Sequence, residues 1–318
     1  PSREIDAVST SRLPDVIAAS ERDGTDVLVV DSIQAIRDPQ IEQGPGSLVQ
    51  VRECSAALVE HAKGSSTAVI LVGHVTKDGN VAGPKTLEHV VDAVLSLDGE
   101  RTGSLRLLRA MKNRFGSCEE TGVFTMTPTG LQVVEDPSAL LLADRLSEVS
   151  GSIVFPSTQG SRSVLVEIQA LVNATTHVPP KRVALGLDQR RLSLLLAVLN
   201  KRTPLDLDTQ EVFVAAAGGI VVKEPAADLA VCLALRSAIE GISVDESTVA
   251  LGEVGLGGEV RRVPNLRRRL VEASRLGFRR ALIPARSEVE DPGLELHEVK
   301  DINAAFDVID ACKRTRAA

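Results

Sequence analysis

The chain has 318 residues, enough for two domains that each bury a core of their own. Hydrophobic residues make up 43% of it but aromatic residues only 2%, so its cores must be built from Leu, Val, Ile and Ala, which suits α/β domains with parallel sheets covered by helices. The net charge of −7 excludes attraction of the average surface to nucleic acid, and any contact with DNA must come from local basic clusters.

The four cysteines, Cys54, Cys118, Cys232 and Cys312, lie far apart and contain no CxxC pair. This spacing supports neither a disulfide framework nor a zinc site, and it is typical of a reducing cytosol. No run of about 18 apolar residues occurs, and the amino terminus lacks the pattern of a signal peptide. We therefore expect a soluble, cytoplasmic protein with no membrane partner.

A short apolar run, 26–30, has the β-branched content of a buried strand. Asp31 and Ser32 follow at its carboxyl end, where ligands gather in open α/β sheets. A carboxylate in that place can hold a hydrated Mg²⁺, as in a Walker B segment, whose Asp helps to position the metal on nucleotide phosphates. An Asp that caps a helix gives the same pattern, and this run by itself does not separate the two interpretations.

A second unit repeats this design. A predicted helix is followed by another apolar strand, 67–72, and then by the polar residues His74, Thr76 and Lys77. We expect these three side chains at the same edge of the sheet as Asp31. A phosphate sensor belongs at such an edge, although loop residues with no role look similar.

The string KNRFG, residues 112–116, stands between two strand-like segments, 104–111 and 121–126. Its cations Lys112 and Arg114 end an apolar run, where they contribute nothing to packing. Arg binds phosphate bidentately and Lys is a mobile point charge for the same target, so the string predicts contact with an anion. The alternative is a solvated hairpin tip.

Gly and Pro between 127 and 139 suggest a domain boundary near 135–138. Strand and helix patterns then alternate to the end of the chain, which predicts a second α/β domain. This half also contains eight arginines between Arg261 and Arg280, among them Arg262 and Arg268. Such a cluster can attract duplex DNA or an acidic neighbour. The alternative is a solvated helix face with ion pairs to the acidic residues Glu259, Glu272 and Glu288.

Six strings occur in the order in which one family has them: VVDSIQ, GPGSLVQVREC, GHVTKDG, AGPKTLEHVVD, KNRFG and GEVGLGGEVRRV. Through them the chain resembles the RadA (Sms) family of bacterial recombination ATPases over nearly its whole length. The resemblance implies a RecA-like ATPase half at 1–136, with a mostly parallel sheet and helices on both faces. It implies an α/β Lon-protease-like domain at 137–318.

The activity implied by the resemblance is DNA-dependent hydrolysis of ATP with Mg²⁺ in homologous recombination and DNA repair. Such proteins bind single-stranded and branched DNA, promote branch migration as a ring, expected to be a hexamer, and can have a RecA-type recombinase as a partner. A P-loop of the form GxxxxGK[ST] does not occur in this sequence. In the family the P-loop and a zinc motif lie upstream of the position of Pro1, so this chain is expected to hold half of a nucleotide site and to be inactive alone.

The resemblance also assigns roles to individual residues. Asp31 would position Mg²⁺ through water, with Ser32 beside it in the nucleotide site; His74, Thr76 and Lys77 would sense phosphate. Lys112 and Arg114 would act in trans on a nucleotide of the neighbouring subunit, or contact DNA directly. The DNA-binding residues would be Lys77, Lys85, Lys112, Arg114, Arg262 and Arg268.

The resemblance to Lon proteases places Ala226 where the nucleophilic Ser belongs and Arg267 where the Lys belongs. Alanine offers no nucleophile, and a guanidinium does not act as a base. We therefore predict no peptidase activity. Two alternatives to the recombination function are kept: an ATP-dependent protease of Lon type, and a purely structural oligomerisation module.

Overall fold

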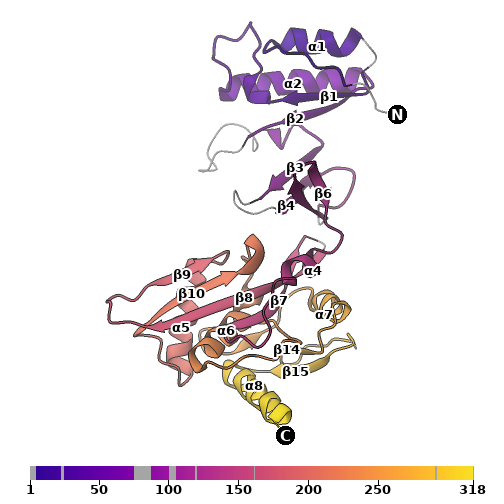
Figure 1. Cartoon of the computed structure of the whole chain (residues 1–318). Helices are drawn as coiled ribbons and strands as arrows, with labels where there is room; N and C mark the ends of the chain where they lie inside the picture. The colour runs from indigo at the N-terminus through magenta and orange to yellow at the C-terminus, as the bar shows by residue number, and fades with distance from the viewer. Residues whose placement is uncertain are drawn as a thin grey trace. The chain divides into compact units, whose positions relative to one another are not determined.

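The computed structural model describes residues 5–22, 25–74, 87–99, 105–118, 120–160, 162–290 and 292–317 (Figure 1). The chain divides into two compact units. The first comprises Pro1–Ser96 and Ala110–Cys118, and the second Leu97–Arg109 and Glu119–Ala318. Both units contain strands and helices, so the predicted α/β class is confirmed. The domain boundary near 135–138 stays a prediction.

The first unit is built on two parallel strands. Its elements are α1 (Leu13–Arg22), β1 (Val27–Asp31), the 3₁₀ turn η1 (Ile33–Ala35), α2 (Leu48–Gly64) and β2 (Ala68–Val72). The helices cover one face of the β1–β2 pair and enclose a core with Val30 and Leu58 (Figure 1). The other face is solvent-exposed, because Val29 is 57% and Ile70 is 51% exposed. The predicted burial of these strands thus holds for one face only.

A four-stranded sheet with the strand order β3-β4-β5-β6 follows. Its strands are β3 (Ala93–Asp98), β4 (Leu105–Asn113), β5 (Thr121–Thr127) and β6 (Gly130–Val133). β4 and β5 are antiparallel, which makes the predicted hairpin around KNRFG. Lys112 lies in β4, one residue before the end of the strand, and Arg114 lies in the loop that follows.

The core of the second unit is a seven-stranded mixed sheet with the order β15-β14-β11-β7-β8-β10-β9. Its strands are β7 (Ser152–Gln159), β8 (Arg162–Ala174), β9 (Arg182–Leu185), β10 (Gln210–Ala216), β11 (Thr248–Ala250), β14 (Arg280–Pro284) and β15 (Glu295–Val299). A two-stranded sheet, β12 (Glu253–Val254) with β13 (Val260–Arg261), lies apart from it.

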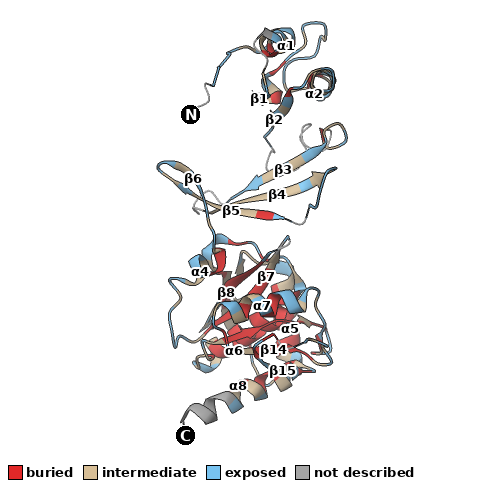
Figure 2. Cartoon of the chain, turned by 90° about the vertical axis from the view of Figure 1, so that its right-hand side faces the viewer, coloured by how far each residue is buried: buried red, intermediate tan, exposed pale blue. Residues whose placement is uncertain are grey.

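The helices of the second unit are α4 (Pro137–Leu142), α5 (Gln189–Arg202), α6 (Asp228–Glu240), α7 (Leu266–Arg275) and α8 (Ile302–Ala317), with 3₁₀ turns η2 (Ala217–Gly219) and η3 (Pro225–Ala227). Helix α6 is buried at every position from Asp228 to Leu235 and packs on β7 and β8 (Figure 2). It ends at Gly241, whose φ of 64° is the left-handed conformation that glycine adopts without strain. Within the described residues, no helix combines the length and apolarity needed to cross a membrane.

Candidate functional site

The carboxyl ends of β1 and β2 meet at one edge of the first unit. The parallel register pairs Asp31 with Val72, and His74 follows two residues beyond β2. Both Asp31 and His74 are exposed. Ser32, and not Asp31, occupies the N-cap position of η1, so the alternative interpretation of Asp31 as a helix cap does not apply. This edge therefore presents a carboxylate and an imidazole to solvent.

Gln34 joins the two strand ends, and the sequence analysis did not identify it. Its side-chain Nε2 donates a hydrogen bond to the carbonyl oxygen of His74 at 3.3 Å. Its Oε1 is buried and has no hydrogen-bond partner among the described residues. The string VVDSIQ contained this residue, but only the folded chain shows that its amide bridges η1 and the end of β2. Thr76, Lys77 and Lys85 lie outside the described residues.

Lys112 is held by backbone carbonyls. Its Nζ donates to the carbonyl oxygens of Glu88 at 2.5 Å and Val91 at 2.8 Å, and its side chain is only partly exposed. An ammonium group has three donors, so two of them are used within this unit. Lys112 thereby fixes the turn between residues 87 and 92 to the end of β4.

Arg114 is bound more loosely. Its Nη1 donates to Asp92 Oδ1 at 2.9 Å, and the two side chains are 52% and 50% exposed. An ion pair as exposed as this one contributes about 0–1 kcal/mol, so a ligand can replace Asp92 at little cost. Phe115 stands next in the loop with 84% of its surface exposed, and Asn113 Oδ1 accepts the Phe115 N–H at 3.0 Å. An exposed ring beside a cation is a surface on which a base can stack.

In the second unit, the two positions assigned to the protease dyad are in different environments. Ala226 lies in η3 and is 3% exposed. The side chain of Arg267 on α7 is 69% exposed and lies 3.6 Å from Glu290. Within the described part of the chain, Arg267 pairs with Glu290, and the Ala226 carbonyl oxygen accepts the Gly252 N–H at 2.9 Å. The buried cation of α7 is instead Arg269, which the sequence does not distinguish from its neighbours.

Arg269 has 1% of its side chain exposed and ties three segments together. It forms an ion pair with Glu224, donates from Nη1 to the Pro156 carbonyl oxygen at 2.6 Å, and donates from Nε to that of Pro264 at 3.0 Å. Its guanidinium also lies 5.7 Å from the ring centroid of Phe155. The role of Arg269 is therefore structural.

Most of the arginine cluster is paired with carboxylates. The ion pairs are Arg261–Glu259, Arg267–Glu290, Arg269–Glu224, Arg275 with Asp136 and Glu272, and Arg280 with Asp245 and Glu295. The hydrogen bond from Arg275 lowers the pKa of the Asp136 carboxyl below its usual range. Arg262, Arg268 and Arg279 are exposed and have no ion-pair partner among the described residues. The predicted partners Glu259 and Glu272 are found, but no ion pair with Glu288 occurs among the described residues. Ion pairs thus account for most of the cluster and leave three cations for a ligand.

The chain is similar over nearly all of its length to bacterial proteins named DNA repair protein RadA. That of Pseudomonas aeruginosa is 45% identical over 311 residues, which are 97% of this chain and 69% of the relative. That of Escherichia coli is 42% identical over 312 residues, with coverages of 98% and 68%. That of Halalkalibacterium halodurans is 47% identical over 267 residues, which are 84% of this chain and 58% of the relative. Residues 194–287 also match a family model described as subunit ChlI of Mg-chelatase.

Proposed function

Because the chain belongs to the RadA family of DNA repair proteins, we propose that it acts in homologous recombination as part of a DNA-dependent ATPase. In this proposal it binds single-stranded and branched DNA and promotes branch migration as a ring, a hexamer, beside a RecA-type recombinase. The observation that carries the proposal is the edge of the β1–β2 pair, where Asp31 and His74 stand exposed and Gln34 bridges the strand ends.

The chemistry of this edge fits a nucleotide with Mg²⁺. The described residues contain no cluster of three or more metal-ligating side chains, and Mg²⁺ on nucleotide phosphates needs only one or two carboxylates because it keeps several waters. Asp31 would hold the ion through water, with Ser32 beside it. Bound Mg²⁺ would neutralise charge on the phosphates. His74, with Thr76 and Lys77, would respond to the terminal phosphate.

The two cations of the KNRFG string, Lys112 and Arg114, have different roles in this proposal. Lys112 keeps the turn at 87–92 in place through two carbonyls, whereas Arg114 can exchange its exposed partner Asp92 for a phosphate. We assign contact with the nucleotide of a neighbouring subunit, or with DNA, to Arg114 in the first place. Phe115 would add stacking on a DNA base, and Lys77, Lys85, Arg262 and Arg268 would add contacts with the DNA backbone.

The test is fluorescence anisotropy of a labelled single-stranded oligonucleotide over a salt series, with this chain and the variants Lys85→Ala, Lys112→Ala, Arg114→Ala, Phe115→Ala and Arg268→Ala. Phosphate contacts make the affinity fall steeply with salt. Loss of a stacked base predicts a roughly five- to hundredfold weaker affinity for Phe115→Ala at every salt concentration, because the ring carries no charge.

Arg267→Ala is the matched control for Arg268→Ala, since Arg267 is its neighbour on α7 and is paired with Glu290. A loss confined to Arg268→Ala would move the DNA from the ATPase half to the arginine cluster. Ring assembly without any DNA binding at low salt would reject the proposal in favour of a structural oligomerisation module. Cleavage of a fluorogenic peptide would contradict the absence of peptidase activity that we propose from Ala226 and Arg267.

A further inference from the structure

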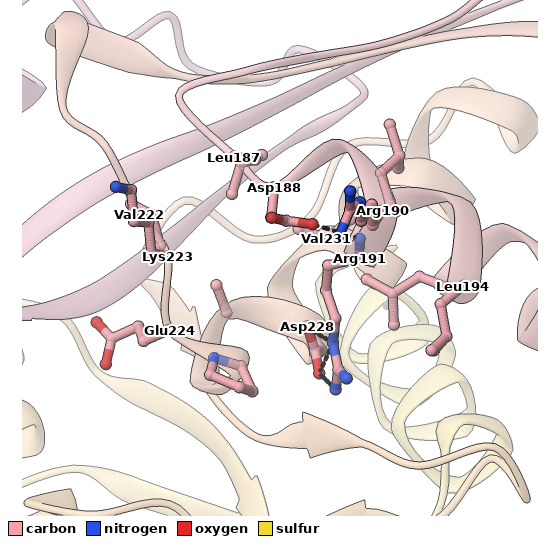
Figure 3. A pocket seen from close by; sticks show the side chains of 14 residues that line it. Leu187, Asp188, Arg190, Arg191, Leu194, Val222, Lys223, Glu224, Asp228 and Val231 are labelled. Atoms are coloured by element: carbon pink, nitrogen blue, oxygen red, sulfur yellow. Dashed lines mark hydrogen bonds and ion pairs between the residues drawn. The ribbon is translucent and has the colours of Figure 1, made fainter. Parts of the chain in front are cut away.

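A pocket of about 300 Å³ lies in the second unit, between the amino-terminal ends of α5 and α6 and the extended segment 222–224 (Figure 3). Its floor is aliphatic, because Leu195, Val222 and Val231 line it and each is at most 4% exposed. A pocket of this size is at the lower end of the range for ligand sites and is large enough for one aliphatic side chain with its backbone.

The acidic side chains around this pocket are engaged within the protein. Asp188 caps α5, accepting the N–H of Arg191 at 2.8 Å. Asp228 accepts hydrogen bonds from the guanidinium of Arg191, with Nε at 3.0 Å from Oδ1, and both side chains are drawn together in Figure 3. Glu224 points away from Asp228 and forms its ion pair with Arg269. Arg191 and Arg269 thus offset the charges of Asp228 and Glu224, and Asp188 is the one carboxylate of the lining that has no ion-pair partner among the described residues.

The basic side chains at the mouth are not engaged in this way. Arg190 on α5 and Lys223 on the extended segment both line the pocket and are exposed. Neither has an ion-pair partner among the residues that the structure describes. The amino-terminal ends of α5 and α6 add partial positive charge. The pocket therefore combines an aliphatic floor with a mouth at which two unpaired cations face one unpaired carboxylate, Asp188, and it favours a ligand that is aliphatic and anionic.

We propose that this pocket binds an acidic peptide segment of a partner protein, with one aliphatic side chain on the floor and neighbouring carboxylates at Arg190 and Lys223. A peptide fits better than a compact small molecule, because one wall is extended backbone. Val222 forms a parallel bridge with Leu187 there, and the Val222 N–H donates to Gly186 at 2.7 Å. Arg190 lies on α5 and Lys223 on the extended segment, so the two cations match carboxylates on different residues of a bound peptide.

The bound segment meets no nucleophile at η3. Pro225 and Ala227 line the pocket, and Ala226 between them carries only a methyl group. Binding without cleavage is therefore expected, and the inference is independent of the proposed role in DNA repair, because it uses only residues of the second unit.

The experiment is fluorescence anisotropy with the full chain and a fluorescein-labelled peptide of sequence Ser-Glu-Leu-Asp-Glu-Ser. We expect saturable binding that Arg190→Glu and Lys223→Glu each weaken by about tenfold or more, because each replaces a charge-assisted hydrogen bond with repulsion. Lys201→Glu makes the same charge change in the last turn of α5, away from the pocket, and should leave binding unchanged. A peptide with Ser in place of Leu should also bind about tenfold more weakly, since its aliphatic group is gone.

Methyl NMR spectra locate the bound peptide, with shifts expected for Val222 and Val231. Absence of saturable binding would overturn the proposal. An equal loss with Lys201→Glu would show nonspecific attraction and overturn it as well. Binding of sodium octanoate at Val222 and Val231 without binding of the peptide would reject the peptide in favour of a small aliphatic carboxylate. The substitutions at exposed positions are checked for folding by circular dichroism, and the Leu-to-Ser peptide needs no change in the protein.

Discussion

The two compact units differ in how deeply they bury their ion pairs. In the first, Asp31 is exposed at the end of a strand, and Arg114 shares an exposed pair with Asp92. In the second, the side chains of Arg269 and Asp228 are 1% and 3% exposed and lie in ion pairs. An exposed charge can leave its partner for a ligand at little cost, whereas a buried charge that loses its partner destabilises the fold. The charges of the first unit's candidate site are thus exposed, whereas the second unit, besides its exposed cations, also uses buried ion pairs as structure.

The hydrophobic core is also less completely covered in the first unit than in the second. In the first unit Leu58 and Val30 are buried under the helices, but Ile70 on the other face of β2 is half exposed. In the second unit the sheet is packed by α6, which is buried from Asp228 to Leu235. A sheet covered on one face buries about half of its apolar surface, so the first unit gains less free energy per residue from burial. The second unit is the more stable scaffold by this comparison.

The largest effect is expected from Arg269→Met. Removing one partner of a buried ion pair leaves Glu224 uncompensated and costs about 3–5 kcal/mol of the free energy of unfolding. Urea denaturation followed by circular dichroism measures it. Arg267→Met on the same helix is the control and should change the free energy of unfolding by less than about 0.5 kcal/mol, because its ion pair is exposed.

Adding Glu224→Gln to Arg269→Met should recover part of the loss, since the stranded carboxylate is then neutral. Similar stabilities of Arg269→Met and Arg267→Met would contradict the structural role of Arg269. The contrast between the exposed charges of the first unit's candidate site and the buried ion pairs of the second unit would then fail.

A smaller effect is expected from Leu58→Ala in the first unit. Leu58 is 0% exposed, so the truncation should cost about 2–5 kcal/mol through lost burial and a cavity. The control is Ile70→Ala, at a position 51% exposed, where about 1 kcal/mol or less is expected. Amide hydrogen exchange of α2 reports both. Equal costs for the two variants would mean that the outer face of β2 is covered in solution, and the contrast between the two cores would disappear.

The sequence patterns predicted the positions of the helices and strands better than they predicted which segments pack against one another. The apolar runs predicted β1 and β2, and the alternating pattern of the second half is seen in elements such as helix α6, which ends at Gly241. The helix proper begins at Asp228, because Pro225 to Ala227 form a separate 3₁₀ turn. Periodicity reports which residues are apolar and how they repeat. It cannot report that one face of a strand pair stays exposed, since that depends on which segments pack against it.

The candidate site shows the same limit at single residues. Arg268 and Arg269 are adjacent and chemically identical, yet one is exposed and the other is buried against Glu224. Two partners of Arg269, Glu224 and Pro156, come from distant segments, and Pro156 and Pro264 both accept through backbone carbonyls. Lys112 likewise binds carbonyl oxygens, which every residue has. Backbone acceptors leave no mark in a sequence, so the residue types were predictable and their partners were not.

The smallest effect concerns the partly exposed ion pair of Asp136. Its Oδ1 caps α4 by accepting the Ala139 N–H at 2.9 Å, and its Oδ2 accepts from Arg275 at 2.8 Å. Chiefly through that hydrogen bond, Arg275 lowers the pKa of Asp136 in the folded state. A lowered folded pKa stabilises the protein above the unfolded pKa of about 4, and this contribution is lost as the pH falls through the folded pKa.

Asp136→Asn keeps an oxygen for the cap but removes the charge. We therefore expect it to lower the free energy of unfolding at pH 7 by about 0.5–1 kcal/mol, discounted for exposure. The difference from wild type should shrink below about pH 4 and vanish once Asp136 is protonated in the folded state. Urea denaturation at pH 7, 5 and 3 measures it, with Asp188→Asn as the control because Asp188 caps α5 without an ion pair to a described residue. A difference that persists unchanged at pH 3 would mean that the amide weakens the helix cap itself. Asp136 would then stabilise the fold through its hydrogen bond to the backbone and not through its charge.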